Sequence, residues 1–212
     1  LDISHDLKNP LSAIQGYAEM LCQKSDSPEL KAIHQNSQRA NRLLNELFEL
    51  SKMDSPDFAI KPVKTDICEI LRQLCAEIVP QLESANFKYD FDIPEESIYV
   101  MLDAARFGRL IQNLTDNAVR YNPESTTISV SLTVDDKSAV IDFNDDGIGI
   151  PAHLTQDIFK PFVRADETRN SQTGGSGLGL SIAKKIAQAH GGDLILRESD
   201  KGCKFRITLP II

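Results

Sequence analysis

The sequence lacks any apolar run long enough to cross a membrane, and it lacks an N-terminal export signal. No apolar stretch approaches the roughly twenty residues that a membrane-spanning helix needs. The first residue is Leu1 rather than Met, and no charged segment followed by an apolar one comes after it. Apolar residues make up 41% and charged residues 25% of the 212 positions, as in an average soluble protein. We therefore expect a soluble, globular fragment of a longer protein.

The sequence also lacks an excess of positive charge. Its formal net charge is −8 at pH 7, whereas proteins that bind nucleic acid carry clustered Lys and Arg that neutralise phosphates. We therefore expect no nucleic-acid partner. An acidic protein that binds a phosphorylated ligand needs a cation, backbone N–H donors and a few local basic side chains to overcome its own field.

Paired cysteines are missing as well. The four cysteines form no C-x-x-C pair, and none has a histidine partner at the spacing of a zinc site. We interpret them as reduced, structural thiols, which fits a cytosolic compartment. They are Cys22, Cys68, Cys75 and Cys203.

Two apolar heptad patterns at the start of the chain predict an antiparallel helical hairpin. Apolar residues recur at alternating spacings of 4 and 3 from Leu7 to Leu21 and again, with Ser37 in the series, from Leu30 to Leu47. Between them, Ser27 is a candidate N-cap and Pro28 a favourable first helical residue. Because one hairpin cannot bury both apolar seams, we expect a homodimeric four-helix bundle. The alternative is that the hairpin packs against the remainder of the chain.

The remainder of the chain predicts a second domain of mixed structure. A proline-containing stretch without helical periodicity separates the two parts, so we expect a hairpin over 1–55, a linker over 56–64 and a second domain over 65–212. A capping box at Asp66 and Glu69 begins a helix. Further helices are expected at 103–121 and 177–190, and strands at 87–93, 128–134, 139–143, 193–198 and 203–209. The fold class is therefore α+β, a helical hairpin followed by a two-layer α/β sandwich.

One candidate nucleophile lies on the first predicted helix. His5 falls at heptad position b, beside the apolar seam but facing water. Asp6 can accept a hydrogen bond from one ring nitrogen and so leave the other free to attack phosphorus. Pro10 removes a backbone hydrogen bond and should bend the helix nearby. A single surface histidine is more often an ordinary solvated residue, so His5 needs support from other motifs.

A second motif places two amides on one face of a helix. Asn113 and Asn117 lie one turn apart, with Arg120 close by. Amide oxygens suit Mg²⁺ and add no negative charge beside a triphosphate, while Arg120 can contact the phosphates. Read alone, this pattern is usually a polar helix face.

Two glycine-containing segments suggest a nucleotide site. Asp145 follows a predicted strand and precedes two glycines, and a carboxylate there can accept a hydrogen bond from an exocyclic amine such as that of adenine. The segment 174–180 opens a helix with flexible backbone N–H groups suited to phosphates. It resembles neither a Walker loop nor a Rossmann loop, because it lacks G-K-[ST] and does not form the first turn of a βαβ unit.

A basic segment lies between these glycine motifs. Lys160 and Arg164 can supply positive charge over a γ-phosphate, and the polar stretch 165–173 is interpreted as a mobile lid. The alternative is an ordinary solvated loop.

Taken in this order, the five segments resemble the H, N, G1, F and G2 boxes of sensor histidine kinases, whose ATP-binding domain has the Bergerat fold. The similarity covers nearly the whole chain. The N and glycine boxes are shared with gyrase, heat-shock chaperone and mismatch-repair ATPases, and His5 on a dimerisation hairpin separates the kinases from them.

The resemblance implies a role for each matched position. It makes His5 the phospho-acceptor, Asp6 its acid-base partner, Asp145 the adenine-reading carboxylate and Asn117 the Mg²⁺ ligand with Asn113 nearby. Asp6-x-x-Asn9 resembles the phosphatase motif of bifunctional members, in which Asn9 orients a water. Further expected nucleotide contacts are Arg120, Tyr121, Gly147, Gly149, Lys160, Gly175, Gly177, Leu178 and Gly179.

The resemblance also implies ATP and Mg²⁺ as cofactors, a response regulator as partner, and the cytoplasmic portion of a membrane-anchored bacterial sensor. Asn113 occupies the place of the catalytic Glu of the related ATPases, which disfavours ATP hydrolysis. A nucleotide-binding interaction module without phosphoryl transfer stays an alternative, although it would not need His5. Asp146 departs from the Asn or Thr of many members and adds negative charge near the base pocket.

Overall fold

The computed structural model describes residues 3–53, 55, 59–164 and 175–212. The chain divides into two compact units, Leu1–Phe58 and Ala59–Ile212, which are treated separately below. Among the described residues, no helix combines the length and the apolar character that crossing a membrane requires.

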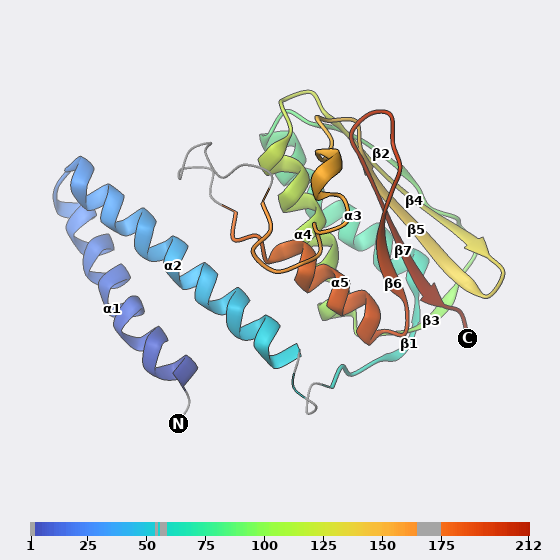
Figure 1. Cartoon of the computed structure of the whole chain (residues 1–212), viewed down its shortest axis with the longest axis horizontal. Coiled ribbons are helices and arrows are strands. Elements are labelled where there is room, and N and C mark those ends of the chain that lie inside the picture. Colours follow the sequence, from blue (N-terminus) through green and yellow to red (C-terminus); the bar gives the residue numbers. More distant parts are fainter. Residues whose placement is uncertain (1–2, 54, 56–58, 165–174) are drawn as a thin grey trace. The chain divides into compact units, whose positions relative to one another are not determined.

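The first unit is a helical hairpin, as predicted. Helix α1 (Ile3–Lys24) and helix α2 (Pro28–Met53) run antiparallel and are joined by a short turn (Figure 1). The Ser27 Oγ accepts a hydrogen bond from the Leu30 backbone N–H at 3.4 Å, which confirms the predicted N-cap of α2. Between the helices, the Asn41 side-chain amide donates to Gln15 Oε1 at 2.6 Å.

The heptad seam of the hairpin is partly open to solvent. Leu7, Ile14 and Leu21 lie one heptad apart on α1 and are 45%, 49% and 48% exposed. On α2, Ile33 and Leu47 are 49% and 40% exposed. The hairpin therefore leaves apolar side chains uncovered at heptad positions that normally pack against another helix.

The second unit contains a mixed sheet with the strand order β2-β4-β5-β7-β6. Only the β2–β4 pair is parallel, and the other neighbours are antiparallel. A separate two-stranded sheet pairs β1 with β3. The strands are β1 (Val63–Asp66), β2 (Lys88–Asp92), β3 (Tyr99–Leu102), β4 (Thr127–Asp135), β5 (Ser138–Asp145), β6 (Asp193–Arg197) and β7 (Cys203–Pro210).

Three helices cover one face of the larger sheet (Figure 1). They are α3 (Ile67–Ser84), α4 (Ala104–Tyr121) and α5 (Gly179–Ala189), and a short 3-10 helix, η1, spans Ala152–Leu154. The core forms between the two layers, where Phe107 of α4 and Phe143 and Phe205 of the strands are all at most 2% exposed. This arrangement confirms the predicted two-layer α/β sandwich.

Asp103 connects three parts of the second unit. Its Oδ1 caps α4 by accepting from the Arg106 N–H at 3.2 Å, and its Oδ2 accepts from the Lys61 N–H at 3.0 Å. The Asp103 N–H donates to His190 Nε2 at 3.0 Å, while His190 Nδ1–H donates to the Ile186 carbonyl of α5 at 2.8 Å. Burial raises the pKa of Asp103, but the N–H donors of Lys61 and Arg106 outweigh it and hold that pKa below its usual value.

Candidate functional site

Helix α4 carries the residues of the predicted amide motif. Asn113 is only 6% exposed, and its side-chain nitrogen has no hydrogen-bond partner among the described residues. Asn117, one turn later, is half-buried, whereas Arg120 and Tyr121 at the end of the helix are exposed. The exposure of these side chains therefore increases along the helix, from the buried amide of Asn113 to the exposed guanidinium of Arg120.

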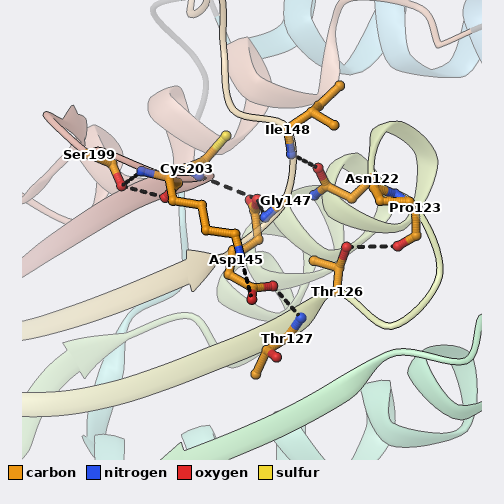
Figure 2. A network of polar contacts seen from close by, with 11 residues as sticks. Asn122, Pro123, Thr126, Thr127, Asp145, Gly147, Ile148, Ser199 and Cys203 are labelled. Atoms are coloured by element: carbon orange, nitrogen blue, oxygen red, sulfur yellow. Dashed lines mark hydrogen bonds and ion pairs between the residues drawn. The ribbon is translucent and has the colours of Figure 1, made fainter.

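Asp145 is the last residue of β5 and is 5% exposed. Its Oδ1 accepts hydrogen bonds from the backbone N–H groups of Gly147 at 3.0 Å and Cys203 at 3.3 Å (Figure 2). Burial raises the pKa of this carboxyl, although the N–H donors of Gly147 and Cys203 and the side chains of Cys203 and Asn122 oppose the rise. A carboxylate is thus held in a buried position with one oxygen fixed by the backbone.

Cys203 adds to this environment. Burial, together with the adjacent Asp145 carboxylate, raises the pKa of the Cys203 thiol to about 12. The thiol therefore stays protonated at neutral pH and brings no second negative charge to the buried carboxylate.

The extra charge of Asp146 is compensated. Its Oδ1 accepts from the Thr127 N–H at 2.7 Å, and its Oδ2 forms an ion pair with Lys201 Nζ at 2.9 Å. The Thr127 N–H and then the Lys201 side chain hold the pKa of Asp146 below its usual value. The negative charge that the sequence places near the base pocket is therefore paired with a lysine and a backbone donor.

The second glycine segment lies against the end of α4. A Cβ atom on Gly175 would come within 2.7 Å of Tyr121 Oη and 2.9 Å of Arg120 Nη1. A Cβ on Gly179, the first residue of α5, would lie 3.8 Å from the Asn113 amide. The N-terminus of α5, with its partial positive charge, therefore faces the amide-bearing helix.

Backbone conformation explains the glycines at two positions. Gly149 and Gly177 have φ values of +73° and +72°, which side chains other than glycine rarely adopt. The Gly177 carbonyl accepts from the Phe162 N–H at 2.9 Å. Leu178 is fully buried, so its side chain belongs to the core and only its backbone can border a ligand.

The two basic residues before the predicted lid, Lys160 and Arg164, are not both fully exposed and unpaired. Lys160 Nζ forms an ion pair with Asp157 at 2.7 Å, and both side chains are exposed. Such exposed pairs contribute about 0–1 kcal/mol and are readily exchanged for another anion. Arg164 is half-buried. The predicted lid, 165–173, lies outside the described residues.

The structure brings together the predicted residues of α4, the Asp145 turn and the segment from Gly175 to Gly179, all within the second unit. His5, Asp6 and Asn9 lie on α1 of the hairpin, and Asn9 is exposed. The side chains of His5 and Asp6 lie outside the described residues.

Sequence reasoning missed two residues of this site. Asn122 directly follows the predicted motif on α4, and Lys201 lies in the turn between β6 and β7. The Asn-Pro dipeptide at 122–123 is the one sequence signal that marks the end of α4, and it indicates a turn rather than a site.

Two family models match the chain. The model described as His Kinase A (phospho-acceptor) domain matches residues 2–56, and the model described as Histidine kinase-, DNA gyrase B-, and HSP90-like ATPase matches residues 102–212.

Relatives along the whole chain are sensor kinases. Sensor histidine kinase WalK of Bacillus subtilis is 32% identical over 99% of this chain, and the probable sensor histidine kinase TcrY of Mycobacterium tuberculosis is 31% identical over 99%. The match spans 36% and 45% of the lengths of these two proteins. The crystal structure of full-length ShkA in complex with AMPPNP has the same fold, with a TM-score of 0.82 at 21% identity over 99% of this chain and 44% of that one.

These matches agree with the division of the chain into a hairpin and a sandwich. The hairpin that carries His5 coincides with the phospho-acceptor model, and the sandwich that carries Asp145 and the glycine segments coincides with the ATPase model. The chain therefore belongs to the sensor histidine kinases, with an ATPase domain of the family that they share with DNA gyrase B and HSP90.

Proposed function

We propose that the chain binds Mg-ATP in its second unit and transfers the γ-phosphoryl group to His5 of the hairpin. The observation that carries this proposal is the buried, backbone-fixed carboxylate of Asp145 in the same unit as the N-terminus of α5 and the amides of α4. A base-reading group, phosphate donors and cation ligands are thereby combined with a candidate phospho-acceptor in one chain.

The second unit holds the nucleotide. Asp145 accepts a hydrogen bond from the exocyclic amine of adenine. The backbone N–H groups between Gly175 and Gly179 and the N-terminus of α5 donate to the phosphates, next to Arg120. The carboxylate of Asp146 would repel the phosphates, and its ion pair with Lys201 weakens this repulsion.

The amides of α4 fit a magnesium ion held jointly with the nucleotide. The unpaired side-chain nitrogen of Asn113 is a donor, and leaving it buried without a partner costs about 1–3 kcal/mol. A phosphate oxygen would satisfy it, so we assign Asn113 to the phosphates and the amide oxygen of Asn117 to Mg²⁺, which prefers oxygen ligands. When bound, the ion supplies charge neutralisation between the β- and γ-phosphates. Among the described residues, no cluster of His, Cys, Asp or Glu offers a stronger metal site.

The transfer step needs few catalytic groups. The free ring nitrogen of His5 attacks the γ-phosphorus in line while the bond to the ADP oxygen breaks, and Asp6 takes up the proton lost from the other ring nitrogen. Arg164 and Lys160 balance charge on the transferred group, so catalysis consists mainly of positioning and electrostatics. Asn113 cannot act as a base towards water, so transfer to His5 outcompetes hydrolysis.

The phosphohistidine passes its phosphoryl group to an aspartate of a response-regulator receiver domain. The exposed heptad residues of α1 support a homodimer in which two hairpins form a four-helix bundle. A sensor region upstream in the longer protein provides the membrane anchor, and this chain is its cytoplasmic portion.

Autophosphorylation is tested with γ-labelled ATP and Mg²⁺ on the wild type, His5→Gln and the control His153→Gln, an exposed histidine of η1. We expect acid-labile, alkali-stable label on the wild type and the control, and a loss of at least a hundredfold in His5→Gln. Equal labelling of His5→Gln would exclude His5 as acceptor. ATP binding without labelling of any variant would favour the nucleotide-binding module, and release of phosphate without protein label would favour an ATPase.

The exposed amide of Asn9 supports a second activity, dephosphorylation of the regulator. In Asn9→Ala we expect at least a tenfold slower release of phosphate from a phosphorylated regulator, because the water loses its orienting amide. Autophosphorylation of the same variant should stay within about twofold of the wild type, which serves as the internal control. Equal losses of both activities would contradict a separate role for Asn9.

A further inference from the structure

Asn122 forms the junction between α4 and the Asp145 turn. It is the C-cap residue of α4, and its backbone N–H donates to the Ala118 carbonyl at 3.1 Å. Its side-chain Oδ1 accepts from the Ile148 N–H at 3.0 Å, and its side chain opposes the rise in the pKa of the Asp145 carboxyl. Figure 2 shows the amide between the end of α4 and the turn that follows β5. One side chain therefore joins the C-terminal end of α4 to the turn that follows Asp145.

Gly147 is explained by this same side chain. A Cβ atom on Gly147 would lie 1.9 Å from Asn122 Oδ1 and 2.7 Å from Asn122 Nδ2, far inside van der Waals contact. Gly147 is not among the glycines with positive φ, so its backbone does not require glycine. The glycine at this position leaves room for the Asn122 amide.

The contacts fix the carboxylate relative to α4. Oδ1 of Asp145 is held by the N–H groups of Gly147 and Cys203, which restricts rotation of the carboxylate. The Asn122 amide connects this turn to α4, the helix that carries Asn113 and Arg120. The distance between the Asp145 carboxylate and the α4 residues proposed to contact the phosphates is thereby kept constant.

We infer that Asn122 is a positioning residue that gives the site its selectivity for a 6-aminopurine, by holding the Asp145 carboxylate in place for the exocyclic amine. This inference rests on the proposed role of Asp145 in reading adenine. Asn122 itself need not touch the nucleotide. Its amide suits this task because its oxygen accepts from the Ile148 N–H while its nitrogen adds no negative charge beside the Asp145 carboxylate, a combination that no aliphatic or carboxylate side chain offers.

The test compares ATP with purine riboside triphosphate, which lacks the 6-amino group, by calorimetric titration of the full chain. Wild-type chain should prefer ATP by about tenfold to a hundredfold, the value of one hydrogen bond to a charged acceptor. In Asn122→Ala, ATP affinity should fall about tenfold while the affinity for the analogue changes less than about threefold. Glu124→Ala, an exposed neighbour two residues away, is the control and should behave as wild type.

A second variant covers the case in which Asn122→Ala fails to fold. Asn122→Asp keeps the acceptor for the Ile148 N–H but replaces the amide nitrogen by a second carboxylate oxygen and places a like charge near Asp145, so selectivity should again be lost in a folded protein. Equal losses of affinity for both nucleotides, or unchanged selectivity, would overturn the inference and leave the role of Asp145 intact. A wild type that binds both nucleotides equally would overturn the role of Asp145 as well.

Discussion

At the scale of single residues, the buried carboxylate of Asp145, the proposed adenine-reading group, opposes folding stability. Because burial raises its pKa above the ordinary value of 3.8, the folded chain holds this proton more tightly than the unfolded chain. Stability therefore falls as the pH rises from about the ordinary pKa through the raised one, and the cost is fully present above it. Buried carboxylates that destabilise a fold are typical of functional sites.

Asp145→Asn should separate these two effects. Relative to wild type, its free energy of unfolding should increase between pH 4 and pH 7, because the variant has no charge to bury. Its ATP affinity should fall at least about tenfold, since a side-chain amide nitrogen would face the adenine amine donor to donor. Chemical denaturation at several pH values measures the first effect, and nucleotide titration measures the second.

The neighbouring carboxylate, Asp146, is a control, because its contribution to stability should depend on pH in the opposite direction. The Thr127 N–H and Lys201 hold the pKa of Asp146 below its usual value, so its contribution to stability is present at neutral pH and is lost as the pH falls through that lowered pKa. Asp146→Asn should therefore lose stability relative to wild type as the pH rises through the lowered pKa to the ordinary value of 3.8, a window below the one in which Asp145→Asn gains stability. Parallel pH profiles for the two variants would contradict the assigned causes of both pKa shifts.

Residue spacing selected the members of the proposed site but not all the partners that the structure gives them. Asn113, Asn117 and Arg120 share a helix, and Asp145 and Gly147 share a turn, so local periodicity was sufficient to select them. The donors that fix Asp145 and Asp146 include Cys203 and Lys201, which are more than fifty residues away in sequence. Contacts of that range depend on the register of β5 with β7, which a single sequence does not encode in any local pattern.

At the scale of elements, the helices were predicted well because their apolar residues recur at helical spacing, and three of them also carry a start signal. Ser27, Asp66 and Asp103 accept hydrogen bonds at the starts of α2, α3 and α4. The pair β1 and β3 was not predicted. Each of these strands has only four residues, and their pairing joins segments more than thirty residues apart. The expected buried face of β2 is also incomplete, since Tyr89 is 41% exposed on this edge strand.

Asp103 shows what a helix start can do beyond capping. Through Lys61 it fixes the chain that enters β1, and through His190 it fixes the end of α5. Both helices that border the nucleotide site, α4 and α5, are therefore anchored at the ends remote from that site. Such anchoring places the proposed site residues of α4 and α5 on rigid elements that do not depend on the glycine segment before α5.

At the scale of the whole molecule, the proposed division of tasks between the two units predicts that dimerisation can be lost without loss of ATP binding. Apolar residues at successive heptad positions of α1, Leu7, Ile14 and Leu21, are nearly half exposed. Burying the exposed half of each such side chain contributes about 0.7–1.5 kcal/mol, so burial of all of them from both subunits in a four-helix bundle stabilises a dimer. The double variant Ile14→Lys and Leu21→Lys should therefore be monomeric at concentrations where the wild type is dimeric, as measured by sedimentation equilibrium.

The nucleotide site should not respond to these changes. Every proposed nucleotide contact lies in the second unit, so ATP affinity of the double variant should stay within about twofold of the wild type. Gln23→Lys adds charge at an exposed position of α1 outside the heptad seam and should stay dimeric. A double variant that remains dimeric would show that another surface joins the subunits. A monomeric wild type would instead favour a hairpin that covers its seam against the remainder of its own chain.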